Sequence, residues 1–180
     1  MIEAPMVLSL TASLYLGIAI AVVANRKTAY SHIRHTISEL AESGSDYSIQ
    51  VSFVVFLPVA IVLSIVALLI GSTNPPIAAL ALAIAIGYGL SAIFPCDPGS
   101  PIIGSFRQAV HNFGGAIEYI GGAFSLFWIS ETAGPVFRIA GFLVAFAAIL
   151  LSFESPLRGV IQRIAELCLF IGLLAVLWLR

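Results

Sequence analysis

Charged residues are scarce in this chain of 180 residues: they make up 9% of it, whereas a typical soluble domain contains about 25%. Hydrophobic residues make up 60%. The formal net charge is −1, and the chain has no basic patch that could neutralise phosphates, which argues against a nucleic acid as a partner. The chain also has only two cysteines, Cys96 and Cys168, which lie far apart in the apolar pattern and are not expected to pair.

Long apolar stretches account for most of the chain. A helix of about 20 apolar residues is long enough to cross a bilayer. Six such stretches are present, at 6–24, 51–70, 77–94, 109–129, 135–153 and 159–179. They are separated by helix breakers such as "GSTNPP", "FPCDPGSP", "ETAGP" and "ESPLRG". The leader "MIEAP" has an acid and no basic residue, unlike a signal peptide, so we expect the first helix to be retained. The sequence predicts an all-α polytopic membrane protein, with a single transmembrane domain over residues 1–180 built as a six-helix bundle.

Basic residues are unevenly divided between the two ends of this bundle. Six crossings put both termini at one end, the far face, while the near face receives the connections 25–50, 95–108 and 154–158. Six basic residues fall at the near face and two at the far face. The six are Arg26, Lys27, Arg34, Arg107, Arg158 and Arg163, and the two are Arg138 and Arg180. The positive-inside rule therefore predicts that the near face is cytoplasmic and that both termini lie outside.

The first near-face connection has the pattern of a short amphipathic helix. Apolar residues recur at helical spacing from Tyr30 to Leu40, and Gly44 supplies a stop. This predicts a helix lying in the membrane interface. Its opposite side, within an arc of about 80°, carries His32, His35, Glu39 and Glu42. Two interpretations stay open for these four residues: a solvated polar face, or a lid over a site below.

The fourth apolar stretch carries a polar stripe. Its members, at offsets of 4, 7, 11 and 14 residues from the first, are His111, Gly115, Glu118, Gly122 and Ser125. Glu118 lies about 10 Å below His111 at the helical rise. A carboxylate at that depth must face protein or a water-filled cavity.

The sixth stretch places Gln162, Arg163 and Glu166 on neighbouring turns, with Glu166 at a similar depth to Glu118. Arg163 is the expected counter-charge, and we expect Glu118, Glu166, Arg163 and His111 to line one cavity, with Glu118 either neutral or paired to Arg163. The cluster can be an ion-paired clasp between helices or a functional pocket.

Asp97 stands in "FPCDPG", where Pro95 and Pro98 restrict the backbone. Asp97 ends one helix and His111 begins the next, so we expect the two side chains to meet. A histidine with a carboxylate partner is the usual oriented base or metal ligand, and it is also a common salt bridge. If a metal is bound, we expect His111 as a ligand with Asp97 and His35 as companions. The sequence itself identifies no cofactor.

Three motifs together carry a family resemblance: "HTISELAESG", "FPCDPG" followed by "HNFGG", and "GVIQRI". They resemble the bacterial and archaeal membrane family called "domain of unknown function 998", over nearly the whole chain and with the same six-helix layout. The resemblance implies a polytopic protein of a prokaryotic inner membrane, without an assigned activity. It also implies that the family's polar motif positions are Ser38, Glu39, Asp97, His111 and Arg163.

A looser similarity is to the seven-helix, metal-dependent lipid amidases of the alkaline ceramidase and adiponectin-receptor type. Those proteins place Ser, Asp and His residues around zinc at one membrane face. This chain has Gln162, Arg163 and Glu166 where they have His-x-x-x-His, and it has one helix fewer.

We therefore hypothesise a polar pocket, open to the cytoplasmic face, that binds a lipid or another amphipathic small molecule, with catalysis left open. The catalytic candidates are His111, Asp97 and Glu118, and the ligand-binding candidates are Arg163, Glu166, Gln162, His35 and Glu39. One alternative is a non-catalytic membrane subunit or assembly protein whose buried charges clasp the helices. Another is a small transporter or proton relay that uses the buried carboxylates, although the far face is nearly bare of polar groups. The expected partners are a membrane lipid, and a homo-oligomer or a larger membrane complex.

Overall fold

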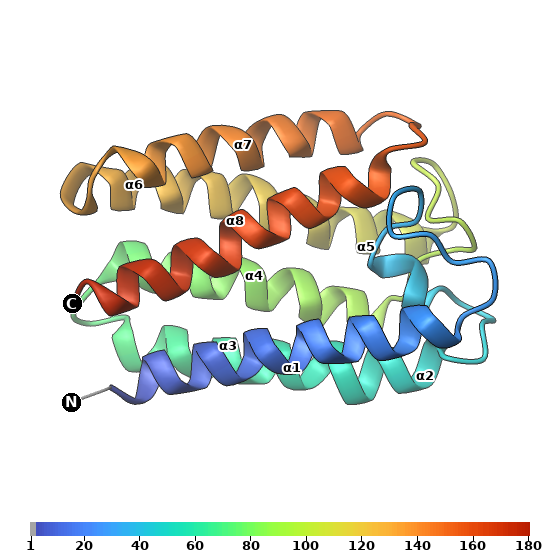
Figure 1. Ribbon diagram of the computed structural model, residues 1–180, viewed down its shortest axis with the longest axis horizontal. Helices are drawn as coiled ribbons and strands as arrows, with labels where there is room; N and C mark the ends of the chain where they lie inside the picture. Colours follow the sequence, from blue (N-terminus) through green and yellow to red (C-terminus); the bar gives the residue numbers. More distant parts are fainter. Residues whose placement is uncertain (1–2) are drawn as a thin grey trace.

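The computed structural model describes residues 3–180, and within that range it contains helices and no strands. The helices form six rods, some of them built from several segments (Figure 1). In chain order the rods are α1 (Ala4–Arg26); α2 (Ser48–Gln50) with η2 (Val51–Phe56) and α3 (Leu57–Ile70); α4 (Pro75–Ile93); α5 (Phe106–Ala116) with η3 (Ile117–Gly121) and α6 (Gly122–Ala133); α7 (Pro135–Leu151); and α8 (Arg158–Trp178). The predicted six-helix bundle is confirmed.

Length and composition make this bundle a membrane protein. Four rods are long and apolar enough to span a bilayer: α1, Ser48–Ile70, α4 and α8. The apolar helix α7 is shorter, with 17 residues, which at the helical rise cover about 26 Å of a hydrocarbon core of about 30 Å. The two termini lie at the same end of the bundle, and the near-face connections lie at the other end (Figure 1).

The segments predicted to break the helices contain residues that cap a helix or allow the chain to turn. Asn74 caps α4, because its side-chain oxygen accepts the N–H of Ile77. Ser105 caps α5 in the same way, accepting from Gln108. Between α6 and α7, Gly134 has a φ of 109°, a conformation that favours glycine.

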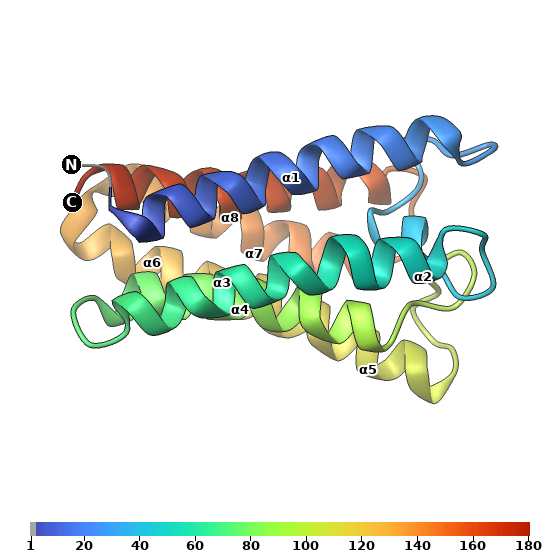
Figure 2. The ribbon, with the colours of Figure 1, turned by 90° about the horizontal axis from the view of Figure 1, so that it is seen from below.

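The rods pack into one core with an apolar exterior. Helix α3 packs along α4, α6 along α7, and α7 along α8, while α1 contacts both α3 and α8 (Figure 2). Leu63, Leu80, Leu126 and Leu169 are fully buried between them. Large apolar side chains are also exposed along the outside of the rods, as expected for a surface that faces lipid.

The second rod contains a π-helical segment, η2, which ends two residues before Pro58. Pro58 has no N–H to donate to the carbonyl of Val54, its expected partner in a helix. The hydroxyl of Tyr15 on α1 donates to that carbonyl instead, at 2.5 Å. A backbone group that would be costly to leave unpaired in hydrocarbon is thus satisfied by a neighbouring helix.

The amphipathic helix expected after α1 is much shorter than its pattern indicates. Only η1 (Ser38–Ala41), a single 3₁₀ turn, forms within residues 27–47, and the rest is turns. Side chains bond to backbone groups that would otherwise pair within a helix: Tyr30 donates to the carbonyl of Thr36, and Glu39 accepts the N–H of Thr36. Glu39 is therefore buried and is not part of a solvated polar face.

Candidate functional site

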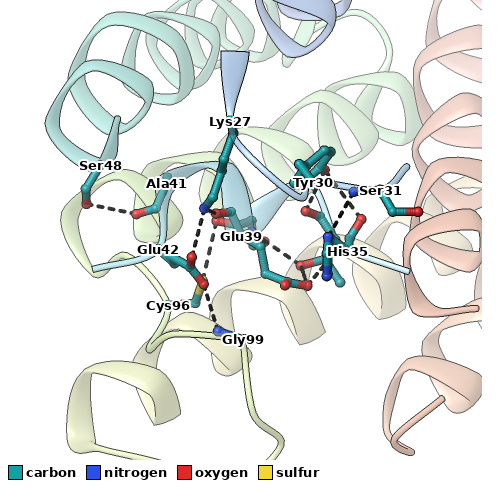
Figure 3. Close-up of polar contacts among 12 residues, drawn as sticks. Lys27, Tyr30, Ser31, His35, Glu39, Ala41, Glu42, Ser48, Cys96 and Gly99 are labelled. Carbon is teal, nitrogen blue, oxygen red and sulfur yellow. Dashed lines mark hydrogen bonds and ion pairs between the residues drawn. The ribbon is translucent and has the colours of Figure 1, made fainter. Parts of the chain in front are cut away.

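Polar contacts join the connections at the near face to one another. Lys27 and Glu42 form an ion pair at 2.8 Å, and the second oxygen of Glu42 accepts the N–H of Gly99 at 2.7 Å (Figure 3). Lys27 also donates to the carbonyl of Glu39. The first and second near-face connections are therefore fastened together, and they cover this end of the bundle.

Arg163 fastens the first connection to α8. Its guanidinium donates to the carbonyls of His32 at 2.8 Å and His35 at 3.0 Å, and to the hydroxyl of Tyr30 at 2.7 Å. The expected ion pair of Arg163 with Glu118 or Glu166 is not formed among the described residues. Of the described residues, only Lys27 with Glu42 and Arg107 with Asp97 form ion pairs.

Asp97 organises its own turn. It accepts the backbone N–H of Ser105 at 2.7 Å and the hydroxyl of Ser105 at 2.8 Å, and it pairs with Arg107 at 2.7 Å. The backbone N–H of Ser105, followed by the side chains of Arg107 and Ser105, lowers the pKa of Asp97 to about 2. His111 bonds to the carbonyl of Phe94 at 3.0 Å instead, so the expected contact between Asp97 and His111 is not formed within residues 3–180.

The candidate metal ligands do not converge. Over the described part of the chain, no three His, Cys, Asp or Glu side chains lie close enough together to hold a metal ion. Asp97 is occupied by Arg107, and Nδ1 of His35 accepts the N–H of Ser31 at 2.9 Å. Burial raises the pKa of Cys96 to about 12, so this thiol is protonated at neutral pH.

Glu166 is the centre of a satisfied polar network inside the bundle. It accepts the hydroxyl of Tyr88 at 3.0 Å and the hydroxyl of Tyr119 at 2.8 Å. Gln162 donates to Tyr119 at 3.0 Å and accepts the N–H of Ile37 at 2.5 Å. The network joins α4, η3, α8 and the first near-face connection, so Glu166 has the geometry of a clasp.

Glu118 has a different environment. Its residue is only 5% exposed, and among residues 3–180 its Oε1 has no hydrogen-bond partner. Its side chain lies against α4 at Gly87, where an added Cβ would come within 2.6 Å of the Cβ of Glu118. Glu118 and its neighbour Tyr119 are both buried. Adjacent residues of a regular helix point about 100° apart, and here both lie within the π-helical segment η3.

A cavity of about 350 Å³ lies beneath the near-face connections, within the usual range of about 300–1,000 Å³ for ligand sites. Its polar lining is Thr36, Ser38, Ser91, Ser100, His111, Asn112, Glu118, Tyr119, Ser152, Arg158 and Gln162. Because a carbonyl only accepts, Nδ1 of His111 must donate to Phe94, which leaves Nε2 as the acceptor of the neutral ring. Ala116 and Ile120 line the cavity and are also exposed on the outside of the bundle.

The predicted site residues are thus divided among several places. The cavity brings together His111, Glu118 and Gln162. Arg163 and Glu166 lie in a second hollow, between α1 and α8. His35 and Glu39 lie in a shallow near-face hollow beside Arg158. Asp97 lines none of these three hollows.

Sequence reasoning missed several polar residues of the cavity, among them Arg158, Asn112 and Tyr119. Arg158 was counted only as a basic residue of the near face. Its Nη1 donates to the carbonyl of Ser100 at 2.7 Å, and its buried Nε has no partner in the described structure. Asn112 follows His111 directly, and Tyr119 follows Glu118, so a regular helical wheel turns both away from the stripe.

Comparison with protein families gives a match over nearly the whole chain. A family model with the description "Protein of unknown function (DUF998)" matches residues 10–179, nearly the whole chain. Comparison with curated proteins and with solved structures gave no match.

Proposed function

We propose, for a chain that belongs to the DUF998 family, that the cavity lined by His111, Glu118 and Arg158 binds an amphipathic molecule, a lipid or a lipid-like compound. The observation that carries the proposal is the buried Oε1 of Glu118, which has no partner among the described residues and belongs to a side chain that lines the cavity. The polar end of the ligand would carry hydrogen-bond donors for this carboxyl group.

The contrast between the two buried carboxyl groups supports this assignment. Glu166 accepts from two tyrosines, and its polar atoms are accounted for without a ligand. An unpaired buried polar group costs about 1–3 kcal/mol, and Glu118 carries such a group. A donor on the ligand would remove that deficit, and Nε2 of His111 offers a second acceptor in the same cavity.

The composition of the cavity wall favours an amphipathic ligand. Ile102, Ala116, Ile120 and Leu151 form an apolar part of the lining. Since Ala116 and Ile120 are also exposed on the outside of the bundle, an apolar tail would have a path to the hydrocarbon. Arg158 belongs both to the cavity and to the near-face hollow, where its guanidinium would contact an acidic group of the ligand. If the ligand is also converted, His111 is the residue placed to move a proton.

The proposal includes an orientation. Six of the eight basic residues lie at the near face, so the cavity would open toward the cytoplasm of a prokaryotic cell, with both termini on the outer side of the inner membrane.

The experiment compares molecules that co-purify with the protein. Gly115 lines the cavity, and a Cβ added there meets only a ring carbon of Tyr119, at 4.0 Å, so Gly115→Trp should occupy the cavity without disturbing the helices. Wild type, Gly115→Trp, Glu118→Gln and the control Ile18→Trp, at an exposed position of α1, are purified from the same membranes. Solvent extracts are compared by mass spectrometry.

We expect a compound that is retained by wild type and Ile18→Trp and is depleted in Gly115→Trp and Glu118→Gln. Extracts that are the same for all four proteins would overturn the proposal, as would a wild-type extract containing only bulk membrane lipid in bulk proportions.

A second candidate function is that of a non-catalytic membrane subunit, because the Glu166 network has the geometry of a clasp that fixes the arrangement of helices. On this reading the chain would be extracted in mild detergent as part of an oligomer or a larger complex. A single copy, measured by light scattering, would reject that reading and leave the binding proposal in place.

A further inference from the structure

The hollow between α1 and α8 is separate from the cavity that carries the proposed function. It has a volume of about 390 Å³, and α1 and α8 lie side by side along one face of the bundle (Figure 2). Apolar side chains of both helices form most of its lining, among them Leu16, Ile20, Leu167, Phe170, Ile171 and Leu174. Its near-face end is formed by Arg163 and His32.

Small residues on α1 keep this hollow open toward the bilayer. A Cβ added at Gly17 would meet no atom within 4 Å, and Ser13 and Ala21 extend the same wall. On the facing helix, Leu167 and Ile171 are 58% and 59% exposed, so they form an outer rim. The hollow is therefore a groove that faces lipid.

The depth of the groove corresponds to one leaflet. It runs along α8 from Arg163 to Leu174, which is about 16 Å at the helical rise. Half of a hydrocarbon core is about 15 Å. The groove thus extends from the near-face interface to about the middle of the membrane, the depth occupied by the acyl chain of a near-face lipid.

The charge at the near-face end selects the head group. Arg163 donates to backbone carbonyls and to the hydroxyl of Tyr30, and within residues 3–180 it forms no ion pair. Glu166 also lines the groove, but its oxygens accept from Tyr88 and Tyr119. A positive charge without an ionic partner therefore lies at head-group depth, where it would attract a phosphate.

We propose that the groove between α1 and α8 binds an acyl chain of an anionic phospholipid of the near-face leaflet, with the phosphate at Arg163 and His32. This site goes beyond the proposed function, because the groove is a separate place in the bundle and shares no lining residue with the cavity.

The test measures binding of two lipids that differ only in the head group. Full-length protein in detergent is mixed with equal amounts of dioleoylphosphatidylglycerol and dioleoylphosphatidylcholine, and bound lipid is counted by native mass spectrometry. We expect wild type to favour the anionic lipid roughly fivefold, the effect of one basic residue near an anionic lipid surface. Gly17→Trp fills the groove and should reduce that binding by about the same factor, whereas Ile18→Trp, on the outer side of α1, should bind as wild type does.

Two further variants complete the test. One distinguishes binding in the groove from binding in the cavity, and the other distinguishes recognition of the head group from recognition of the acyl chain. Gly115→Trp should leave binding of the anionic lipid unchanged, since it fills only the cavity. His32→Glu brings a negative charge to an exposed position, and it should abolish the preference between the two lipids. Equal binding of both lipids by wild type, unchanged binding by Gly17→Trp, or a preference that survives His32→Glu would each overturn the inference. None of these variants replaces Arg163, because its side chain also holds the first near-face connection in place.

Discussion

Replacing each buried glutamate by glutamine should affect Glu166 and Glu118 differently. Glu166 accepts from Tyr88 and from Tyr119, and a glutamine has one carbonyl oxygen, so only one of these two bonds keeps its acceptor. A hydrogen bond to a charged group contributes about 1.5–3 kcal/mol, and bonds between membrane helices average about 0.6 kcal/mol. We therefore expect Glu166→Gln to lower the free energy of unfolding by about 1–2 kcal/mol.

Glu118→Gln should cost nothing comparable. The Oε1 of Glu118 has no partner within the described residues, so no bond is lost there, and the substitution keeps the size of the side chain. It also removes any charge that would be costly to bury. The free energy of unfolding should stay within about 0.5 kcal/mol of wild type or increase.

Thermal unfolding in one detergent at neutral pH, followed by circular dichroism, measures both effects. For a chain of this size, 1 kcal/mol shifts the Tm by about 2–4 °C, so Glu166→Gln should lower the Tm by about 2–8 °C and Glu118→Gln should not. If both substitutions lower the Tm equally, Glu118 has a structural partner, and the argument for a ligand at its oxygen is refuted.

Three further predictions concern the near face and the first helix. The pKa of Asp97 in the folded protein is depressed to about 2. Its contribution to stability is therefore present above the ordinary pKa of 3.8 and is lost as pH falls through about 2. Asp97→Asn should lower the Tm at pH 7 but not near pH 2, whereas the exposed control Asp46→Asn should leave the Tm unchanged at both. Tyr15→Phe leaves the carbonyl of Val54 unpaired and should lower the free energy of unfolding by about 1 kcal/mol, measured by denaturant titration. Reporter fusions should place the near-face connections in the cytoplasm and both termini outside, and a cytoplasmic C-terminus would contradict the orientation.

The rods could be predicted because their signals are local. Each apolar run is bounded by residues that end helices whatever surrounds them, such as Asn74 before Pro75 or Gly134 before Pro135. The short helix after α1 could not be predicted in the same way. Its periodicity is real, but bonds from Tyr30 and Glu39 to the backbone of Thr36 compete with the helical ones.

The candidate site was predicted only in part. Residues that lie together on one helix could be predicted, whereas contacts between segments far apart in the sequence could not. His111 and Glu118 share the cavity because both lie on one stripe of one rod. Arg163 was assigned to the carboxyl groups from its spacing to Glu166, yet it donates to carbonyls of a connection about 130 residues away in sequence. That contact depends on the path of the near-face chain, about which the spacing along α8 carries no information.

The position of Glu118 depends on a feature that no periodic pattern records, the absence of a side chain at Gly87. A Cβ at Gly87 would lie 2.6 Å from the Cβ and 2.7 Å from the carboxyl carbon of Glu118, too close for either helix to keep its place. Gly87→Ala should therefore cost about 1–3 kcal/mol of overpacking and displace Glu118 from the cavity. Gly89, two residues along the same helix, is the matched control: its added Cβ would meet Ala60 at an ordinary 3.6 Å. If both alanine variants have the Tm and the co-purified compound of wild type, then close packing against α4 is not what holds Glu118 in the cavity.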